Sequence, residues 1–117
     1  MTQTPENATV PIEIDVHEVK RLIDSEAEFL LVDCREQPEN EYCRIAGSFL
    51  IPMNETPYRL SELENHRDKR IIIYCHLGGR SLQVTQWLRT QGFDQVQNMT
   101  GGIDVWSQII DPDVPRY

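Results

Sequence analysis

One short segment of the sequence combines a nucleophile, two glycines and a permanent cation: Cys75, His76, Leu77, Gly78, Gly79 and Arg80. A free cysteine has a pKa of about 8.5, so it needs help to react as a thiolate at neutral pH. If the loop curls around the sulfur, its backbone N–H groups and the N-terminus of a following helix stabilise the thiolate. Two adjacent glycines suit this loop because they can adopt positive φ and let the backbone approach an anion. The pattern predicts nucleophilic chemistry at Cys75, although a buried cysteine before a simple turn has the same pattern.

The residues around this segment are expected to form a strand before it and a helix after it. The apolar run 71–74 is typical of a buried strand, and residues 81–91 place apolar side chains at helical spacing. A second apolar run, 29–32, predicts another strand. Unbroken apolar runs are typical of parallel sheets that helices cover on both faces. We therefore expect an α/β fold with Cys75 at the carboxyl end of a strand, where such folds bind ligands.

The rest of the chain completes a single domain. Asp15 and Glu18 form a capping-box pattern that starts a helix, and the residues around Val96 favour a further short strand. A Gly-Gly turn then leads into a last helix, which ends before Pro112. The predicted organisation is an N-terminal tail over 1–11, a domain over 12–110 and a C-terminal surface tail over 111–117.

Composition excludes several classes of function. The chain has 117 residues, a net charge of −8, and 11 Lys and Arg scattered among 19 Asp and Glu. This size fits one domain, and the lack of a basic stripe argues against nucleic acid as a partner. No secretory leader or membrane-length apolar run is visible, which argues against a membrane. The odd number of cysteines argues against a disulfide framework, so we expect a cytoplasmic protein.

The cysteines and histidines outside the loop 75–80, which are Cys34, Cys43, His17 and His66, form no catalytic or metal-binding pattern. Cys34 follows a buried strand and Cys43 lies near apolar residues, so both are interpreted as packing residues. His17 and His66 stand among charged residues and lack partners at metal-ligand spacing. We therefore expect neither a metal site nor a cofactor.

Four ordered stretches resemble signatures of the rhodanese family, the single-domain sulfurtransferases. They are the stretch 31–36, the stretch 41–48, the loop 75–80, and a C-terminal signature made of Gly92-Phe93, Val96 and 101–106. The resemblance covers about 12–106 and implies a three-layer fold with a central, mostly parallel sheet flanked by helices. Two positions depart from the family: Arg44 stands where His is common, and His76 stands where Arg is common.

The resemblance implies a sulfurtransferase of the thiosulfate type. Cys75 would take sulfur from thiosulfate or a persulfide donor, become a persulfide, and pass the sulfur to cyanide, a thiol or an acceptor protein. The loop residues expected to bind substrate are His76, Leu77, Gly78, Gly79 and Arg80. By analogy with the family, three residues would brace the structure through ion pairs near the site: Asp33, Arg35 and Glu41.

Two other functions share this fold. Dual-specificity phosphatases also place a Cys and an Arg around an anion, but their loop has one more residue than the four between Cys75 and Arg80. They also usually carry His where this chain has Tyr74. The second alternative is a binding or sulfur-relay module without catalysis, since fold alone does not establish function.

The C-terminal stretch 110–117 contains two prolines and ends in Tyr117. It resembles tails on rhodanese domains that are fused to adenylyltransferases and supply sulfur to carrier proteins. A sulfur-carrier protein is therefore a candidate acceptor. A tail that only packs over the domain is an equal alternative.

Overall fold

A five-stranded parallel sheet forms the centre of the computed structural model, which describes residues 10–117. Most of the predicted N-terminal tail, residues 1–9, lies outside the described residues. The strand order is β1-β5-β4-β2-β3. The strands are β1 (Glu13–Ile14), β2 (Leu30–Asp33), β3 (Phe49–Leu50), β4 (Ile71–Tyr74) and β5 (Val96–Met99).

The two central strands are the apolar runs that the sequence predicts as buried strands. All four residues of β4 are buried, and so are three of the four residues of β2. They pair in parallel with Val32 beside Ile73 and Asp33 beside Tyr74. β1 and β3 have two residues each, too short for a periodic pattern, and the sequence did not predict them.

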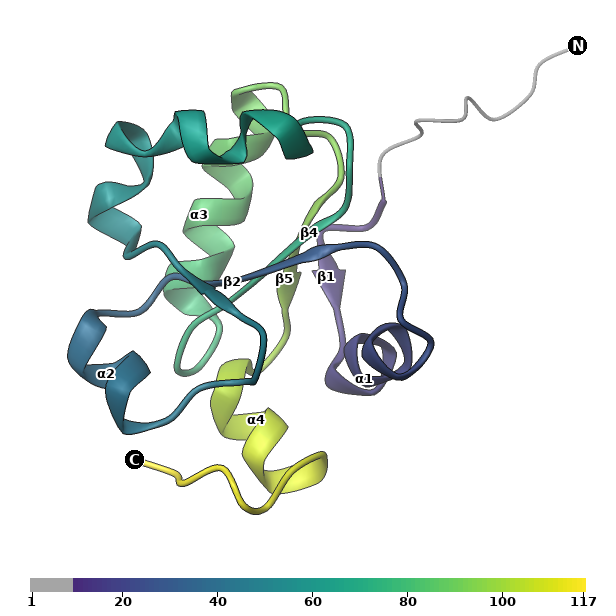
Figure 1. The fold of residues 1–117 in the computed structure, drawn as a ribbon, viewed down its shortest axis with the longest axis vertical. Coiled ribbons are helices and arrows are strands. Elements are labelled where there is room, and N and C mark those ends of the chain that lie inside the picture. Colours follow the sequence, from purple (N-terminus) through teal and green to yellow (C-terminus); the bar gives the residue numbers. More distant parts are fainter. Residues whose placement is uncertain (1–9) are drawn as a thin grey trace, which may run out of the picture.

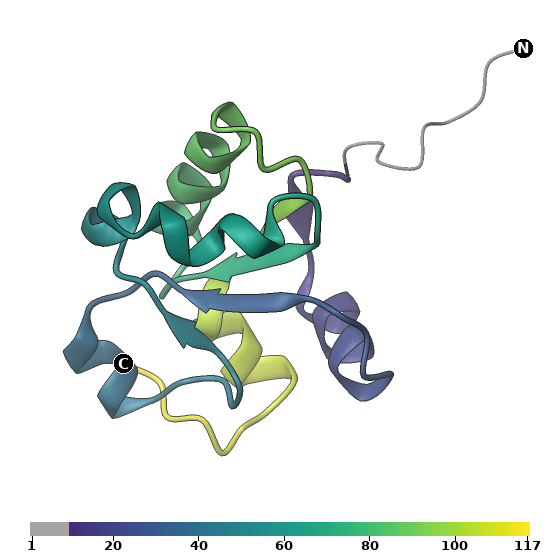
Figure 2. The same ribbon diagram turned by 45° about the horizontal axis from the view of Figure 1, so that its top comes forward.

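Helices cover both faces of the sheet, as Figures 1 and 2 show. α1 (Val16–Asp24) and α4 (Gly102–Ile109) pack on one face through Val16, Val19, Ile103 and Trp106. α3 (Gly79–Thr90) covers the other face together with two 3-10 helices, η1 (Met53–Tyr58) and η2 (Leu60–His66). The predicted α/β fold with three layers is therefore confirmed.

The helix starts follow from local chemistry. The Asp15 carboxylate caps α1 by accepting a hydrogen bond from the backbone N–H of Glu18 at 2.9 Å. α2 (Gln37–Tyr42), which the sequence analysis missed, has a full capping box in which Glu36 and Glu39 accept each other's backbone N–H groups. With six residues and no buried side chain, α2 lacks the apolar face that would reveal it.

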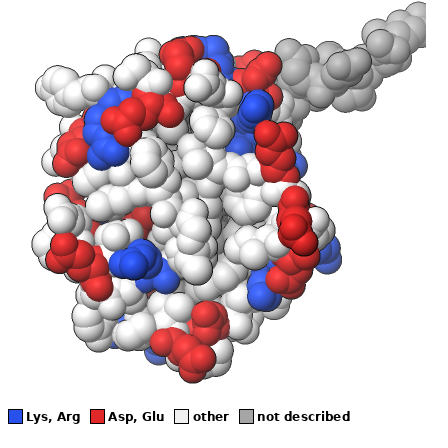
Figure 3. Space-filling view, in the orientation of Figure 1, with Lys and Arg blue, Asp and Glu red and all other residues white. Residues whose placement is uncertain are grey.

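The C-terminal segment 111–117 turns back along the domain and ends beside α2 in both ribbon views (Figures 1 and 2). On the face shown in Figure 3, acidic and basic side chains are interspersed. Over the described residues, no helix is both long and apolar enough to cross a membrane.

Candidate active site

Cys75 follows β4 directly, and the loop after it folds back over its sulfur. The Cys75 Sγ lies 3.1 Å from the backbone nitrogen of Gly78 and 3.4 Å from that of Ser81. The Ser81 hydroxyl lies 3.2 Å from the sulfur and shares its single proton between Cys75 Sγ and Asn98 Oδ1. We call residues 75–81 the sulfur cradle. Two backbone N–H groups therefore point at the sulfur, as the sequence predicts, together with a side-chain donor that the sequence analysis missed.

Only one of the two loop glycines has the expected positive φ. Gly78 has φ +108°, which an L-residue rarely adopts, and a Cβ there would lie 3.3 Å from the backbone nitrogen of Gly101. Gly79 has no positive φ and opens α3, so the prediction of a special backbone conformation at Gly79 is wrong. A single left-handed residue is enough because α3 begins immediately and supplies the Ser81 N–H.

The N-terminus of α4 is hydrogen-bonded to the backbone of the cradle. The N–H of Ile103 donates to the carbonyl of Cys75 at 2.9 Å, and the N–H of Asp104 donates to the carbonyl of His76 at 3.1 Å. Gly102 allows this approach, because a Cβ there would come within 2.4 Å of the His76 carbonyl oxygen. The C-terminal Gly-Gly turn thus positions the nucleophile's loop.

The surroundings of Cys75 favour the thiolate strongly. A hydrogen bond from Cys34, followed by those from Ser81 and Gly78, lowers the pKa of Cys75 to about 4 although burial opposes the charge. The same hydrogen bond, together with burial, raises the pKa of Cys34. At neutral pH Cys75 is therefore the charged nucleophile, and Cys34 is the proton donor beside it.

Cys34 and Cys43 are both buried among apolar residues, which agrees with their interpretation as packing residues. Cys34 also lies next to the nucleophile. The reason is strand register. β2 and β4 are paired up to Asp33 and Tyr74, which places the next residues, Cys34 and Cys75, side by side.

Arg80 does not extend freely toward an incoming anion. Its guanidinium forms two hydrogen bonds with the Glu39 carboxylate, at 2.8 and 3.0 Å. This pairing lowers the pKa of Glu39 to about 2, so the pair is charged on both sides at neutral pH. The sequence analysis missed Glu39 because it lies 41 residues from Arg80 on a helix without an apolar face.

A second ion pair is fully buried. The Arg35 guanidinium donates to Asp33 Oδ1 at 2.8 Å and Oδ2 at 2.6 Å, and neither side chain is exposed. Arg35 also donates to the carbonyl of Cys43 at 2.6 Å. The bracing role expected of Asp33 and Arg35 fits this geometry. It does not fit Glu41, which is exposed and accepts a hydrogen bond from Gln37 rather than joining an ion pair within the described residues.

Tyr117 links both ion pairs to the cradle. Its hydroxyl accepts a hydrogen bond from Arg35 at 2.9 Å and donates one to Glu39 at 2.7 Å. Its ring stacks on His76, with the ring centroids 3.9 Å apart, and its backbone oxygen lies 2.9 Å from His76 Nε2. We call Asp33, Arg35, Glu39, Arg80 and Tyr117 the side-chain bracket. His76 is thus engaged by the tail, whereas Leu77 beside it is 64% exposed.

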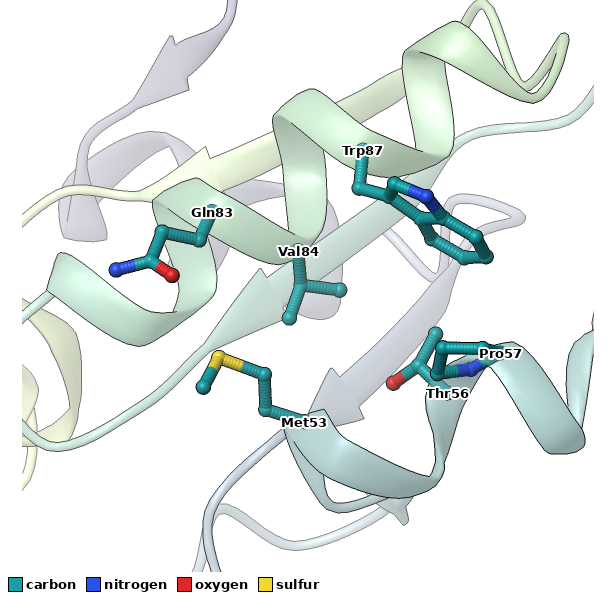
Figure 4. Close-up of a pocket in the computed structure, with 6 residues that line it drawn as sticks. All are labelled: Met53, Thr56, Pro57, Gln83, Val84 and Trp87. Carbon is teal, nitrogen blue, oxygen red and sulfur yellow. The ribbon is translucent and has the colours of Figure 1, made fainter.

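A cavity of about 220 Å³ lies between η1 and α3, a short distance along α3 from the cradle (Figure 4). Met53 and Pro57 face Val84 and Trp87 across it, so its walls are mainly apolar. None of the residues lining it belongs to the cradle. The cavity is therefore a neighbouring feature and contributes no group to the reacting sulfur.

Comparisons with known proteins identify the family of this chain. The profile of the rhodanese-like domain matches residues 15–109. A protein named sulfurtransferase from Allochromatium vinosum is 39% identical over 89 residues, which cover 76% of this chain and 80% of that protein. The chloroplastic rhodanese-like/PpiC domain-containing protein 12 of Arabidopsis thaliana is 38% identical over 91 residues. These cover 74% of this chain and only 30% of the plant protein.

A solved structure gives the same result for the fold. The crystal structure of SSP1007 from Staphylococcus saprophyticus superposes with a TM-score of 0.76 at 31% identity. The match covers 91% of this chain and all of that one. The sequence profile, the relatives and the fold together show that the chain belongs to the rhodanese-like domain family.

Proposed function

We propose that this protein is a sulfurtransferase of the thiosulfate type, in which Cys75 carries the transferred sulfur as a persulfide. The observation that carries the proposal is the set of hydrogen bonds converging on Cys75 Sγ from Gly78 and Ser81. A sulfur held as a thiolate at neutral pH is the nucleophile that sulfane-sulfur transfer needs. The name of the Allochromatium relative, sulfurtransferase, supports the same class of reaction.

The first half-reaction charges the enzyme. The Cys75 thiolate attacks the outer sulfur of thiosulfate, the new S–S bond forms at Cys75, and sulfite leaves with the electron pair of the old bond. The product is an anionic persulfide. The cradle stabilises negative charge at the same place before and after transfer, so little has to reorganise during the step.

The second half-reaction discharges the enzyme. Cyanide, a small thiol or a protein acceptor attacks the outer sulfur, and Cys75 leaves as the thiolate that the cradle already favours. Hydrogen bonds to charged groups are worth about 1.5–3 kcal/mol each, so the cradle stabilises the departing thiolate. A thiol with a low pKa leaves faster, which makes Cys75 a good leaving group. No general base, metal or cofactor is required of the protein by this cycle.

The residues of the loop supply the substrate contacts in this proposal: His76, Leu77, Gly78, Gly79 and Arg80. Their backbone N–H groups and the α3 N-terminus attract the anionic donor. Arg80 contributes less than a free cation would, because Glu39 neutralises it. The exposed side chains of Leu77 and Tyr42 offer an apolar rim for a larger acceptor.

A protein thiol or a sulfur-carrier protein is the acceptor we propose, and the tail resemblance described above supports that choice. The working location that we propose is the cytoplasm, because a thiolate with a low pKa and three free cysteines suit a reducing compartment. Residues 12–110 are the proposed catalytic domain, and the tail 111–117 completes its rim through Tyr117.

Intact-mass spectrometry after exposure to thiosulfate tests the proposal. The wild type should gain about 32 Da, one sulfur atom, and cyanide should remove it. Cys75→Ala should gain nothing, while Cys43→Ala, another buried cysteine outside the cradle, should load like the wild type. A folded wild type that gains no sulfur from thiosulfate or from a persulfide donor would favour a non-catalytic binding module instead.

A further inference from the structure

The nucleophile has a second thiol as its direct neighbour. Cys34 extends β2 by one residue, and its backbone N–H donates to the Tyr74 carbonyl at 3.0 Å, which continues the pairing with β4. Cys34 and Cys75 belong to the same hydrophobic cluster on the α3 face of the sheet, with 0% and 1% exposure. Their side chains therefore meet inside the protein.

The spacing of the strands suits a bond between these two sulfurs. Neighbouring strands lie about 4.7–4.9 Å apart, whereas disulfides join residues whose Cα atoms are about 4.4–6.8 Å apart. Both side chains lie on the same face of the sheet, in one hydrophobic cluster. A disulfide between Cys34 and Cys75 thus needs little backbone movement. Cys43 has no such opportunity, since it belongs to the cluster on the opposite face.

We propose that Cys34 is a resolving cysteine that converts the Cys75 persulfide into an internal disulfide and releases the carried sulfur as hydrosulfide. The Cys34 sulfur attacks Cys75 Sγ, the bond between Cys75 and the outer sulfur breaks, and that sulfur leaves with the electron pair. The proton of the Cys34 thiol goes to the leaving sulfur, giving HS⁻. The two cysteines are oxidised, the sulfane sulfur is reduced, and no other oxidant is needed.

This inference rests on the proposed persulfide cycle and adds a second fate for its intermediate. An external acceptor attacks the outer sulfur, whereas Cys34 attacks the inner one, so the two reactions compete for the same persulfide. Cys34 keeps its proton in the resting protein and does not compete with Cys75 for the donor. When acceptor is scarce, the protein is expected to release hydrosulfide and to rest as a disulfide that cellular thiols reduce.

The test follows the loaded protein over time without acceptor or reductant. Wild type, Cys34→Ser and Cys43→Ser are each charged with thiosulfate, freed from the excess, and sampled by intact mass and a sulfide assay. Wild type and Cys43→Ser should first gain about 32 Da, and Cys34→Ser is followed from whatever fraction of it gains the same mass. Wild type and Cys43→Ser should then convert to a species about 2 Da lighter than the reduced protein, with one equivalent of sulfide.

Cys34→Ser should keep its added sulfur on the order of ten times longer, because serine retains the hydrogen-bond donor but cannot form the disulfide. Peptide mapping of the aged wild type should find Cys34 joined to Cys75, a result that needs no variant. A wild-type persulfide that lasts as long as that of Cys34→Ser, with no linked peptide, would overturn the resolving role and leave the sulfurtransferase intact. Absence of the 32 Da adduct in all three proteins would instead refute the proposed function, and the resolving role with it.

Discussion

The sulfur cradle and the side-chain bracket are adjacent, but they are built in opposite ways. The cradle is local: its donors, Gly78 and Ser81, lie three and six residues from Cys75. The bracket is assembled across the chain, with Arg35 and Tyr117 separated by 82 residues and Glu39 and Arg80 by 41. The cradle acts through backbone N–H groups and a hydroxyl, whereas the bracket consists of four charged side chains and the Tyr117 hydroxyl that joins them.

Because of this difference, we expect the cradle to control the reactivity of Cys75 and the bracket to control the stability of the fold. The cradle sets the charge of the nucleophile, so changes in it should alter the pKa of Cys75 more than the stability of the fold. The bracket ties β2, α2, the loop and the C-terminal segment together, so changes in it should alter stability while the pKa of Cys75 stays low. Four substitutions test this division, beginning with the largest expected effect.

Replacing Arg35 should have the largest effect on stability. Arg35→Met leaves the fully buried Asp33 carboxylate without its cation, which typically costs about 3–5 kcal/mol. Urea unfolding measures this loss. The matched control is Arg21→Met, which breaks an exposed pair with Glu18 and should change stability by less than about 1 kcal/mol. Equal losses for the two variants would refute the central role of the buried pair.

Gly78→Ala should damage the cradle. The positive φ at this position costs an L-residue about 1–2 kcal/mol, and relief of that strain would turn the N–H away from Cys75. The variant should be less stable and its Cys75 should have a higher pKa. Gly47→Ala has a similar φ of +85° and open space around it, so it should lose stability alone. A Cys75 pKa that stays unchanged in Gly78→Ala would contradict the role of this N–H.

Ser81→Ala should raise the pKa of Cys75 by about one unit, since it removes one hydrogen bond to a charged sulfur. The shift appears in the pH dependence of thiol alkylation. Ser107→Ala also removes a buried hydroxyl, but that one donates to Val114 and lies outside the cradle. Its alkylation profile should match the wild type. Identical profiles for both variants would show that the Ser81 hydroxyl does not act on the thiolate.

Tyr117→Phe should have the smallest effect. It removes the hydroxyl that joins Arg35 to Glu39 but keeps the ring that stacks on His76. Because the residue is 45% exposed, a stability loss of about 0.5–1.5 kcal/mol is expected, with no change in the Cys75 pKa. Tyr58→Phe, at a position that is 88% exposed, should be neutral in the same thermal melts. A neutral Tyr117→Phe would mean that the tail rests on the bracket without stabilising it.

The same contrast between local and long-range structure explains which elements the sequence could predict. The strand before Cys75, the loop and the helix after it are contiguous, so apolar periodicity and glycine placement predicted them. The two short strands, β1 and β3, and the 3-10 helices over 53–66 carry no periodic signal, so the sequence analysis missed them. Their structure depends on pairing and packing with distant parts of the chain.

The site residues also divide into those that a local pattern identifies and those that distant parts of the chain contribute. Cys75 and Gly78 could be identified from the loop alone, whereas Glu39 and Tyr117 enter the site through contacts that no local pattern shows. Cys34 is intermediate. Both strands were predicted, but only their observed register places Cys34 beside Cys75, which is the basis of the resolving role that we propose for it.

The pKa of Cys75 tests the central claim most directly, and iodoacetamide alkylation of Cys75 across pH 3 to 10 measures it, with Cys75→Ala as the blank. Because Cys34, together with the cradle donors Ser81 and Gly78, lowers this pKa to about 4, the rate should be flat from about pH 5 upward and fall only near pH 4. A rate that instead rises toward pH 8.5, as for an ordinary thiol, would show that the cradle does not hold a thiolate.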